Sequence, residues 1–327
     1  MAWRRALAAL ALVGGMWAVV DARAQSAAAA DAGSCPPAVP ALTGEQMNAA
    51  ARRALDRGFL WRLSKDGRTA WLFGTIHVGR LEWIFLGPQL RAALTAADTV
   101  ALEIDVSDPA IAQQAAELSR APADLPPLPA ALRDRLARQV AAACLPAQAF
   151  DGQHPVMQAM TLTALAGRWD GLEAPFAQEV VLSSFAKSQG KPLVSLESVA
   201  LQMSVLIPSD AAKVVELTDH TLAQLEQGKS RSMLARLARI WELGLLDELS
   251  QYERWCDCVQ DDDDRAQLKQ LNDDRNPQLA AGIDALHAQG KTVFAAVGAL
   301  HMVGEQGLPK LMRQLGYTVE RVAFTPQ

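Results

Sequence analysis

The sequence lacks the short motifs that mark several large enzyme classes. It contains no Walker A loop, no G-x-S-x-G nucleophile elbow, no H-E-x-x-H pair and no Rossmann glycine fingerprint. Their absence argues against nucleotide-dependent, serine-hydrolase and zincin chemistry. The chain also lacks an excess of basic residues, since 31 Lys and Arg stand against 36 Asp and Glu. The resulting formal net charge of -5 gives no support for a nucleic-acid partner.

Cysteine is scarce, and its spacing does not suit a zinc ribbon. The four cysteines are Cys35, Cys144, Cys256 and Cys258. A ribbon needs two residues between paired cysteines, whereas Cys256 and Cys258 enclose only one. We therefore expect one or two structural disulfides in an oxidising compartment rather than a metal site. The spacing leaves all three possible pairings open.

The N-terminus carries an apolar run that is typical of a signal peptide. Arg4 and Arg5 precede the uncharged stretch 6–20, and small residues at 22–24 suit a cleavage site before Gln25. The run is shorter than the ~20 residues that span a bilayer, which favours cleavage over a retained anchor. No later stretch is long and apolar enough to span a membrane.

The sequence thus predicts a signal peptide over residues 1–24 and an Ala-, Pro- and Ser-rich flexible leader over 25–45. A single domain over 46–327 would follow. We expect the mature protein to be secreted, in a periplasm if the cell has two membranes, and to have no membrane span. The sequence leaves its oligomeric state open.

The pattern of apolar runs predicts an α/β fold. A β-hairpin is expected over 59–73, with its turn at Lys65-Asp66-Gly67. Further strands are expected over 99–105, 191–197, 292–297 and 316–323, separated by amphipathic helices. Such alternation indicates a central, largely parallel sheet flanked by helices. The block at about 108–187 has no strong strand and is predicted to be a large helical insertion.

Two copies of Gly-x-x-His are the first candidate site. Gly74 to His77 and Gly298 to His301 each follow an apolar run. In each copy the glycine is expected to let the backbone turn tightly at the end of a buried strand. The histidines would then lie in the crevice outside the strand ends, where open α/β sheets bind ligands. Neutral imidazoles there could ligate a divalent metal or one could act as a base, although a histidine after a strand is also often structural.

Acidic residues end two of the other predicted strands. Glu103 follows a run too apolar to bury a bare carboxylate, so it should meet a metal, an arginine or a histidine. It could complete a metal site with His77 and His301, act as a base, or form a structural salt bridge. Asp105 is a weaker alternative on the same predicted strand. Glu197 has the same setting and could serve catalysis or support its neighbours.

Three further polar residues are secondary candidates or have structural explanations. Gln202 is expected on the helix that follows Glu197. Arg275 could clamp a carboxylate or stabilise an oxyanion, or simply bridge to a nearby acid. Asn276 could cap the helix that begins near Pro277.

Together these residues resemble the TraB/PrgY/GumN family. The resemblance rests on the order and spacing of Leu72 to His77, Ala101 to Glu103, Ser195 to Glu197 with Gln202, Arg275-Asn276, and Val297 to Gly304. It covers roughly residues 45–323. The resemblance implies a fold similar to the erythromycin-esterase and ChaN group, with His77, His301 and Glu103 as site residues and Arg275 as a further polar group.

The family includes the Tiki proteins, described as metal-dependent proteases. The resemblance therefore implies an exported hydrolase, most readily a peptidase acting on a peptide or protein. It would use a divalent metal such as Mn²⁺, Co²⁺ or Zn²⁺ held by His77, His301 and Glu103, with Arg275 at the oxyanion. The alternative is a non-catalytic envelope protein that binds haem or a peptide, as ChaN-like relatives suggest.

Overall fold

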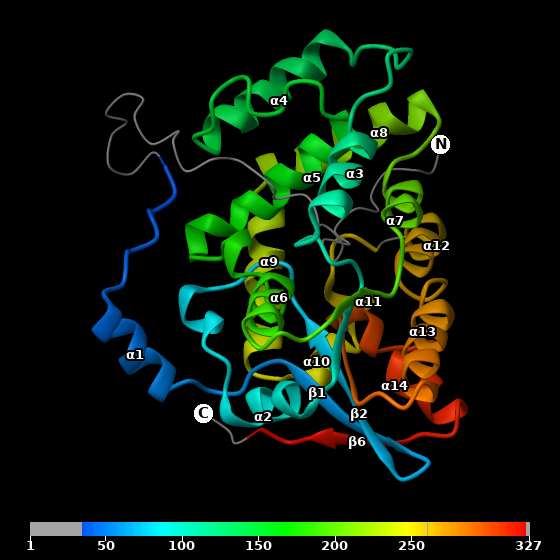
Figure 1. The fold of residues 1–327 in the computed structure, drawn as a ribbon. Helices are drawn as coiled ribbons and strands as arrows, with labels where there is room; N and C mark the ends of the chain where they lie inside the picture. The colour runs from blue at the N-terminus through cyan, green and yellow to red at the C-terminus, as the bar shows by residue number, and fades with distance from the viewer. Residues whose placement is uncertain (1–34, 260, 325–327) are drawn as a thin grey trace.

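The computed structural model describes residues 35–259 and 261–324 (Figure 1). The predicted signal peptide over 1–24 and most of the predicted leader lie outside the described residues. In this described part, no helix has the length and apolar character needed to cross a bilayer.

One six-stranded sheet organises the fold, with the strand order β4-β3-β5-β2-β1-β6. The pairings of β3 with β4, β3 with β5 and β2 with β5 are parallel, whereas β1 pairs antiparallel with both β2 and β6. Every strand except β1 therefore runs in the same direction. This confirms the predicted α/β fold with a largely parallel sheet and a β-hairpin. The strands are β1 Phe59–Lys65, β2 Arg68–Thr75, β3 Thr99–Leu102, β4 Leu193–Ser195, β5 Val293–Gly298 and β6 Thr318–Val322.

The hairpin turn forms where Asp66-Gly67 predicts it. Both residues have positive φ, 52° and 70°, as a two-residue turn between twisted strands requires. Strand β3 is shorter than predicted and ends before Glu103 and Asp105. Beyond Leu102 side chains enter the contacts with the neighbouring strands: the Gly298 N–H donates to the Glu103 carboxylate, and the Asp105 N–H donates to the Ser195 hydroxyl at 2.9 Å.

Helices flank the sheet and build a second layer above it in Figure 1. The predicted insertion between β3 and β4 is occupied by α3 to α6, which confirms its helical character. The helices are α1 Gly44–Arg52, α2 Pro88–Ala96, α3 Pro109–Leu118, α4 Ala130–Ala142, α5 Pro155–Leu165, α6 Gln178–Ser188, α7 Val199–Leu206, α8 Ala211–Glu226, α9 Lys229–Glu242, α10 Leu246–Leu249, α11 Tyr252–Trp255, α12 Asp262–Leu271, α13 Asn276–Ala288 and α14 Leu308–Gln314, with short 3₁₀ turns η3 Leu81–Ile84, η4 Ala166–Asp170, η5 Ala174–Phe176 and η6 Ala299–Met302.

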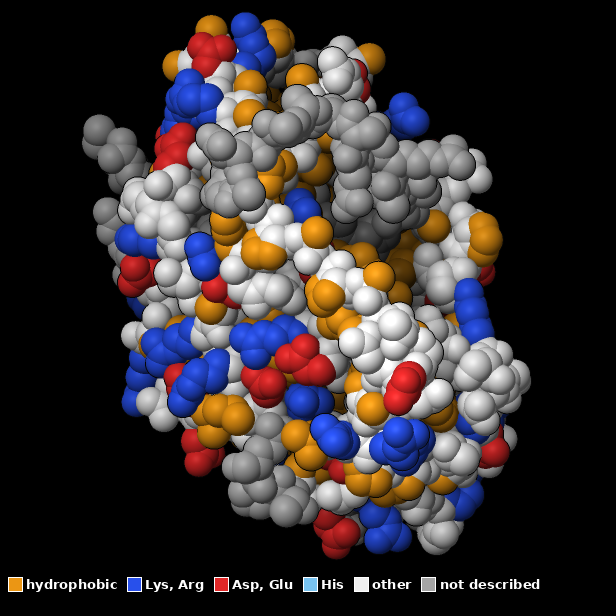
Figure 2. All heavy atoms as spheres, turned by 90° about the vertical axis from the view of Figure 1, so that its left-hand side faces the viewer, with side chains coloured by type: hydrophobic (Ala, Val, Ile, Leu, Met, Phe, Trp, Pro, Cys, Tyr) orange, Lys and Arg blue, Asp and Glu red, His pale blue; other side chains and the backbone are white. Residues whose placement is uncertain are grey.

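Two apolar cores hold these layers. The larger core surrounds the sheet and includes the fully buried Phe59, Phe73 and Phe294. The smaller core joins helices of the insertion to α7 and α8, through residues such as Met157 and Leu222. On the face drawn in Figure 2, Lys and Arg side chains lie among Asp and Glu.

The structure pairs Cys35 with Cys144 and Cys256 with Cys258. The Cα atoms are 5.7 Å and 5.0 Å apart, as disulfide geometry requires. The expectation of structural disulfides is confirmed, and the pairing that the sequence left open is now assigned. The first bond joins the segment before α1 to Cys144, in the turn that follows α4.

Candidate functional site

The carboxyl ends of four neighbouring strands meet at one place. His77 follows β2, Glu103 follows β3, Glu197 follows β4 and His301 lies in η6 directly after β5. These four strands are parallel neighbours, so their carboxyl ends share one edge of the sheet. All four side chains are at most 8% exposed. The fold therefore gathers residues from four distant parts of the chain into one buried polar cluster.

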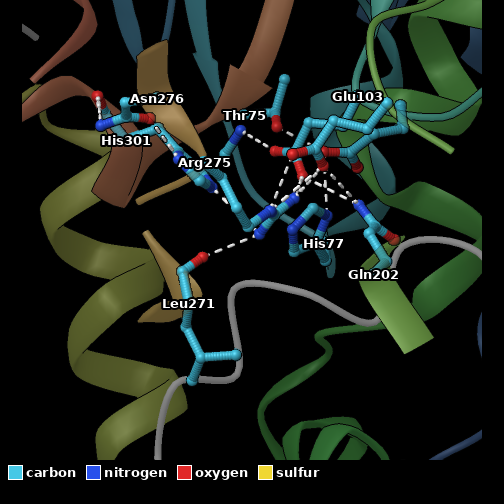
Figure 3. A network of polar contacts seen from close by, with 11 residues as sticks. Thr75, His77, Glu103, Gln202, Leu271, Arg275, Asn276 and His301 are labelled. Atoms are coloured by element: carbon cyan, nitrogen blue, oxygen red, sulfur yellow. Dashed lines mark hydrogen bonds and ion pairs between the residues drawn. The ribbon is translucent and has the colours of Figure 1, made fainter. Parts of the chain in front are cut away.

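The remaining predicted residues join this cluster from helices (Figure 3). Gln202 comes from α7, while Arg275 and Asn276 stand at the start of α13. All three are buried. The structure thus brings every sequence-predicted site residue into one region, except the weaker alternative Asp105. Asp105 is held by Ser107, whose backbone N–H and hydroxyl both donate to its Oδ1.

The two Gly-x-x-His motifs lie side by side because β2 pairs with β5. Gly74 is opposite Val297, and Thr75 is opposite Gly298, so the glycines are offset by one position. Neither glycine has a positive φ. Gly298 ends β5 directly before the turn η6, whereas Gly74 lies one residue before the end of β2. A Cβ on Gly74 would instead lie 3.3 Å from the Cα of Ala299. Gly74 is thus needed for the close approach of one motif to the other.

Arg275 lies at the centre of the cluster. Its Nε donates to Glu197 at 2.9 Å, and its Nη2 donates to Glu103 at 3.0 Å and also contacts Glu197 closely. Its Nη1 donates to the Leu271 carbonyl at 2.8 Å and lies 3.4 Å from His301 Nε2. Every N–H of the guanidinium therefore has an acceptor within the protein. In this arrangement Arg275 orients the two carboxylates, and no N–H is left over for the oxyanion role predicted from the sequence.

Both carboxylate oxygens of Glu103 accept hydrogen bonds. Its Oε1 accepts from the backbone N–H of Gly298 at 2.5 Å. Its Oε2 accepts from Arg275 at 3.0 Å and from the Gln202 amide at 3.3 Å. The same amide of Gln202 also lies 3.4 Å from Glu197, so it bridges the two acids. Glu103 is thereby fixed beside the second Gly-x-x-His motif.

These contacts keep Glu103 ionised. Burial alone would raise its pKa, but His301, Arg275 and His77 lower it, and the net effect is a pKa of about 2. A carboxylate with so low a pKa is a weak proton acceptor at neutral pH. It suits a charged ligand better than the general base that the sequence left as an option.

The neighbouring asparagine fixes the tautomer of His301. The Asn276 amide nitrogen faces the carbonyls of His301 and Gln306, at 3.4 and 2.8 Å, so its Oδ1 must accept. That oxygen lies 2.6 Å from His301 Nδ1, which therefore carries the proton. Burial lowers the pKa of His301 to about 4, although Glu103 opposes the shift. His301 is thus neutral at pH 7 and presents the lone pair of Nε2 toward Arg275.

His77 has a partner that the sequence reading missed. Its Nδ1 lies 2.9 Å from Oε1 of Glu179, an ion-pair distance, although the direction falls outside good hydrogen-bond geometry. Thr75 donates its hydroxyl to the same oxygen. Burial is the largest influence and lowers the pKa of His77, but Glu179 and the charge of Glu103 together outweigh it, and the net shift is upward. The Nε2 of His77 is buried and has no hydrogen-bond partner among the described residues.

Glu179 reaches the site because the insertion docks on the loop after His77. Gly79 and Glu173 exchange backbone hydrogen bonds at 2.9 and 2.7 Å. The N–H of Gln178 donates to the Ile76 carbonyl at 3.1 Å. Glu179 then stands in the first turn of α6. In the sequence, a buried site acid at a helix start looks the same as an ordinary solvated acid that favours a helix N-terminus. No local pattern could therefore have identified Glu179.

The donor types at this site fit a divalent cation. Two imidazoles and an ionised carboxylate suit metals such as Mn²⁺, Co²⁺ or Zn²⁺. The Nε2 atom of His77 is buried and has no hydrogen-bond partner among the described residues, so it is available as a metal ligand. Yet in residues 35–259 and 261–324 no three His, Cys, Asp or Glu side chains are arranged to hold a metal. Arg275 contacts both His301 and Glu103, so a metal that used both would require Arg275 to shift.

Comparison with known proteins agrees with this geometry. The family model described as the TraB/PrgY/gumN family matches residues 59–321. The chain belongs to this family. The TraB/PrgY/gumN match begins at the first residue of β1 and ends at Arg321 in β6, so it includes every residue of the cluster and all of the sheet except the last residue of β6.

One curated relative of this TraB/PrgY/gumN chain carries a functional name. The chain is similar to a protein named Metalloprotease TIKI1 from Danio rerio, with 23% identity over 309 residues. The match covers 80% of this chain and 62% of that protein, so the chain spans less than two thirds of the relative's length. No solved structure gives a significant match.

Proposed function

We propose that this chain is an exported, metal-dependent hydrolase that cleaves peptide bonds. The observation that carries the proposal is the convergence of His77, Glu103, Glu197 and His301 at the carboxyl ends of four parallel strands. Open α/β sheets bind their ligands at such ends. The likeness to a protein named as a metalloprotease supports the reaction class. The two disulfides support an oxidising compartment outside the cytoplasm.

His77, His301 and Glu103 are the residues proposed to hold the metal. A bound divalent metal would supply Lewis acidity, which polarises a scissile carbonyl and acidifies a water molecule. Neighbouring polar residues set the tautomer and the orientation of these three side chains. Asn276 keeps the proton of His301 on Nδ1, so Nε2 retains its lone pair and could ligate a metal once Arg275, 3.4 Å away, shifts. Arg275 holds the carboxylate of Glu103 in a defined orientation through their 3.0 Å contact.

Glu179 completes the arrangement around His77. A carboxylate at Nδ1 orients the ring and raises the basicity of the opposite nitrogen, as in many metal-ligating histidines. The 2.9 Å contact between Glu179 and Nδ1 of His77 supports this role. The side chains around the reaction are all buried, which strengthens each electrostatic interaction by excluding water.

Metal binding and peptide cleavage test the proposal together. Protein purified without a His-tag is titrated calorimetrically with Mn²⁺, Co²⁺ and Zn²⁺ and incubated with a peptide mixture, with and without chelator. We expect His77→Ala, His301→Ala and Glu103→Gln to weaken metal binding at least tenfold and to lower cleavage by about 10²-fold or more. His220→Ala, which alters a histidine outside the cluster, is the matched control.

Two results would contradict the proposal. One is wild-type protein that binds none of the three metals and cleaves no peptide. The other is full metal binding and cleavage by both histidine variants. A haem absorption band in the purified protein, together with the first result, would favour a ligand-binding role instead.

A further inference from the structure

An apolar cavity lies directly beside His77. It has a volume of about 40 Å³, and His77 and Thr75 form part of its wall. The rest of its lining is hydrophobic and comes from the start of β1, the β2–η3 loop, the ends of α5 and α10, η6, and α9. His77 therefore faces both the polar cluster and this cavity. A group held in the cavity would lie next to the reacting centre.

The wall of the cavity is rigid on the α9 side. Trp241 Nε1 donates to the Gly74 carbonyl at 2.7 Å, and its ring lies 4.9 Å from that of Trp83. Gly58 has no Cβ, and one built there would lie 2.8 Å from the Trp241 ring. The indole is therefore fixed by contacts on several sides. A wall that cannot yield selects its occupant by size and shape.

The opening of the cavity is less constrained. Ile76, Leu237 and Ala299 line it and are only partly buried, whereas Leu234, Trp241 and Leu300 are buried. The partly exposed residues mark the side from which a side chain could enter. The lining offers very little polar surface apart from Thr75 and His77, so a charged or amide-bearing occupant would lose its hydration without compensation.

We propose that this cavity is the subsite that receives an aliphatic side chain of the substrate, at a residue flanking the scissile bond. The proposal rests on the proposed peptidase function and adds the substrate class. A water-sized group needs about 10–15 Å³, so the cavity holds three or four carbon atoms. Valine, leucine and isoleucine side chains match this size, whereas the ring of phenylalanine exceeds it.

The first experiment measures binding without catalysis. Metal-free protein is titrated with N-acetyl-leucine amide and with the similarly sized but polar N-acetyl-asparagine amide, and methyl NMR follows Ile76 and Leu237. We expect saturable shifts of both methyl groups with the leucine probe and at least tenfold weaker binding of the asparagine probe. Ala164→Leu, which fills the cavity, should weaken binding of the leucine probe at least tenfold.

Two further variants separate selectivity from stability. Leu237→Ala enlarges the opening, and we expect it to bind N-acetyl-phenylalanine amide at least tenfold better than wild type does. Leu225→Ala is the matched control, because this leucine is also partly buried but packs in the smaller core. Leu225→Ala should leave the affinity for all three probes unchanged. Since Leu237 is partly exposed, its replacement is expected to fold even if Ala164→Leu does not.

The second experiment sequences the products of a peptide mixture cleaved in the presence of Mn²⁺, Co²⁺ or Zn²⁺. We expect valine, leucine or isoleucine at one fixed position beside the cut, and tolerance of phenylalanine there in Leu237→Ala. Cleavage without an aliphatic preference, or no methyl shift with the leucine probe, would overturn the subsite. Leucine-probe binding without any cleavage would instead overturn the peptidase function and support an apolar side-chain site.

Discussion

At the scale of single residues, the buried charges depend on one another. Arg275 neutralises two buried acids whose other hydrogen-bond donors are uncharged. Arg275→Met should therefore destabilise the protein by about 3–5 kcal/mol, because Glu103 and Glu197 would remain buried without their cationic partner. Adding Glu103→Gln and Glu197→Gln should restore most of the lost stability. Urea unfolding of the single and triple variants measures both effects, and a triple variant no more stable than the single one would contradict this account.

Glu179 offers a second test at this scale. Its charge raises the pKa of His77, so Glu179→Gln should lower that pKa. NMR titration of the His77 ring in chelator-treated protein measures the change. Glu173→Gln is the matched control, because Glu173 lies nearby but pairs with Arg168 instead. An identical His77 titration in both variants would show that Glu179 does not act on this ring.

The sequence predicts most of the site but not all of it. His77, Glu103, Glu197 and His301 could be found because each follows an apolar strand, a position at which a polar side chain is conspicuous. Glu179 could not, since its contact with His77 depends on how the insertion docks. The central place of Arg275 was equally hidden. Its five donors are distributed by tertiary contacts that no local pattern encodes.

At the scale of elements, a buried histidine begins α5. His154 accepts from the Val156 backbone at 3.3 Å and so caps the helix, and burial lowers its pKa below 6.5. Below pH 6.5 the unfolded chain binds a proton that the folded chain does not. Stability must therefore fall as the pH drops from 6.5 toward the lowered pKa, with a slope of at most about 1.4 kcal/mol per pH unit.

His154→Asn tests this coupling. Asparagine keeps a capping acceptor but cannot titrate. Urea unfolding between pH 7 and 5 should give a shallower loss of stability for the variant than for wild type. Parallel curves would mean that His154 titrates normally. His301, whose pKa is also lowered, contributes a loss of the same sign in both proteins and cancels from the comparison.

Structural elements were predicted well where the residues within the element determine its conformation. The Asp66-Gly67 turn forms as expected, because a two-residue turn with positive φ is favoured by these residues themselves. The length of β3 and the packing reason for Gly74 were not predicted. Both depend on a neighbouring segment, Ser195 in one case and Ala299 in the other.

At the scale of the whole molecule, the two disulfides differ in what they constrain. Cys35–Cys144 spans a sequence separation of 109, whereas Cys256–Cys258 spans 2. Loop-closure entropy gives about 5 kcal/mol for the long loop and less than about 2 kcal/mol for the short one. Replacing the first pair by serine should therefore cost much more stability in urea unfolding than replacing the second. Equal losses would contradict this ranking.

The direction of β1 has a practical consequence. Because β1 is antiparallel to β2, their turn at Asp66-Gly67 lies at the end of the sheet opposite to His77 (Figure 1). The space around Gly67 is open. A peptide epitope or a fluorescent reporter inserted there would project from the pole of the molecule opposite the cluster. Protein immobilised through this turn would present the end that carries the polar cluster to solution, which makes the turn a suitable attachment point for surface-based binding assays.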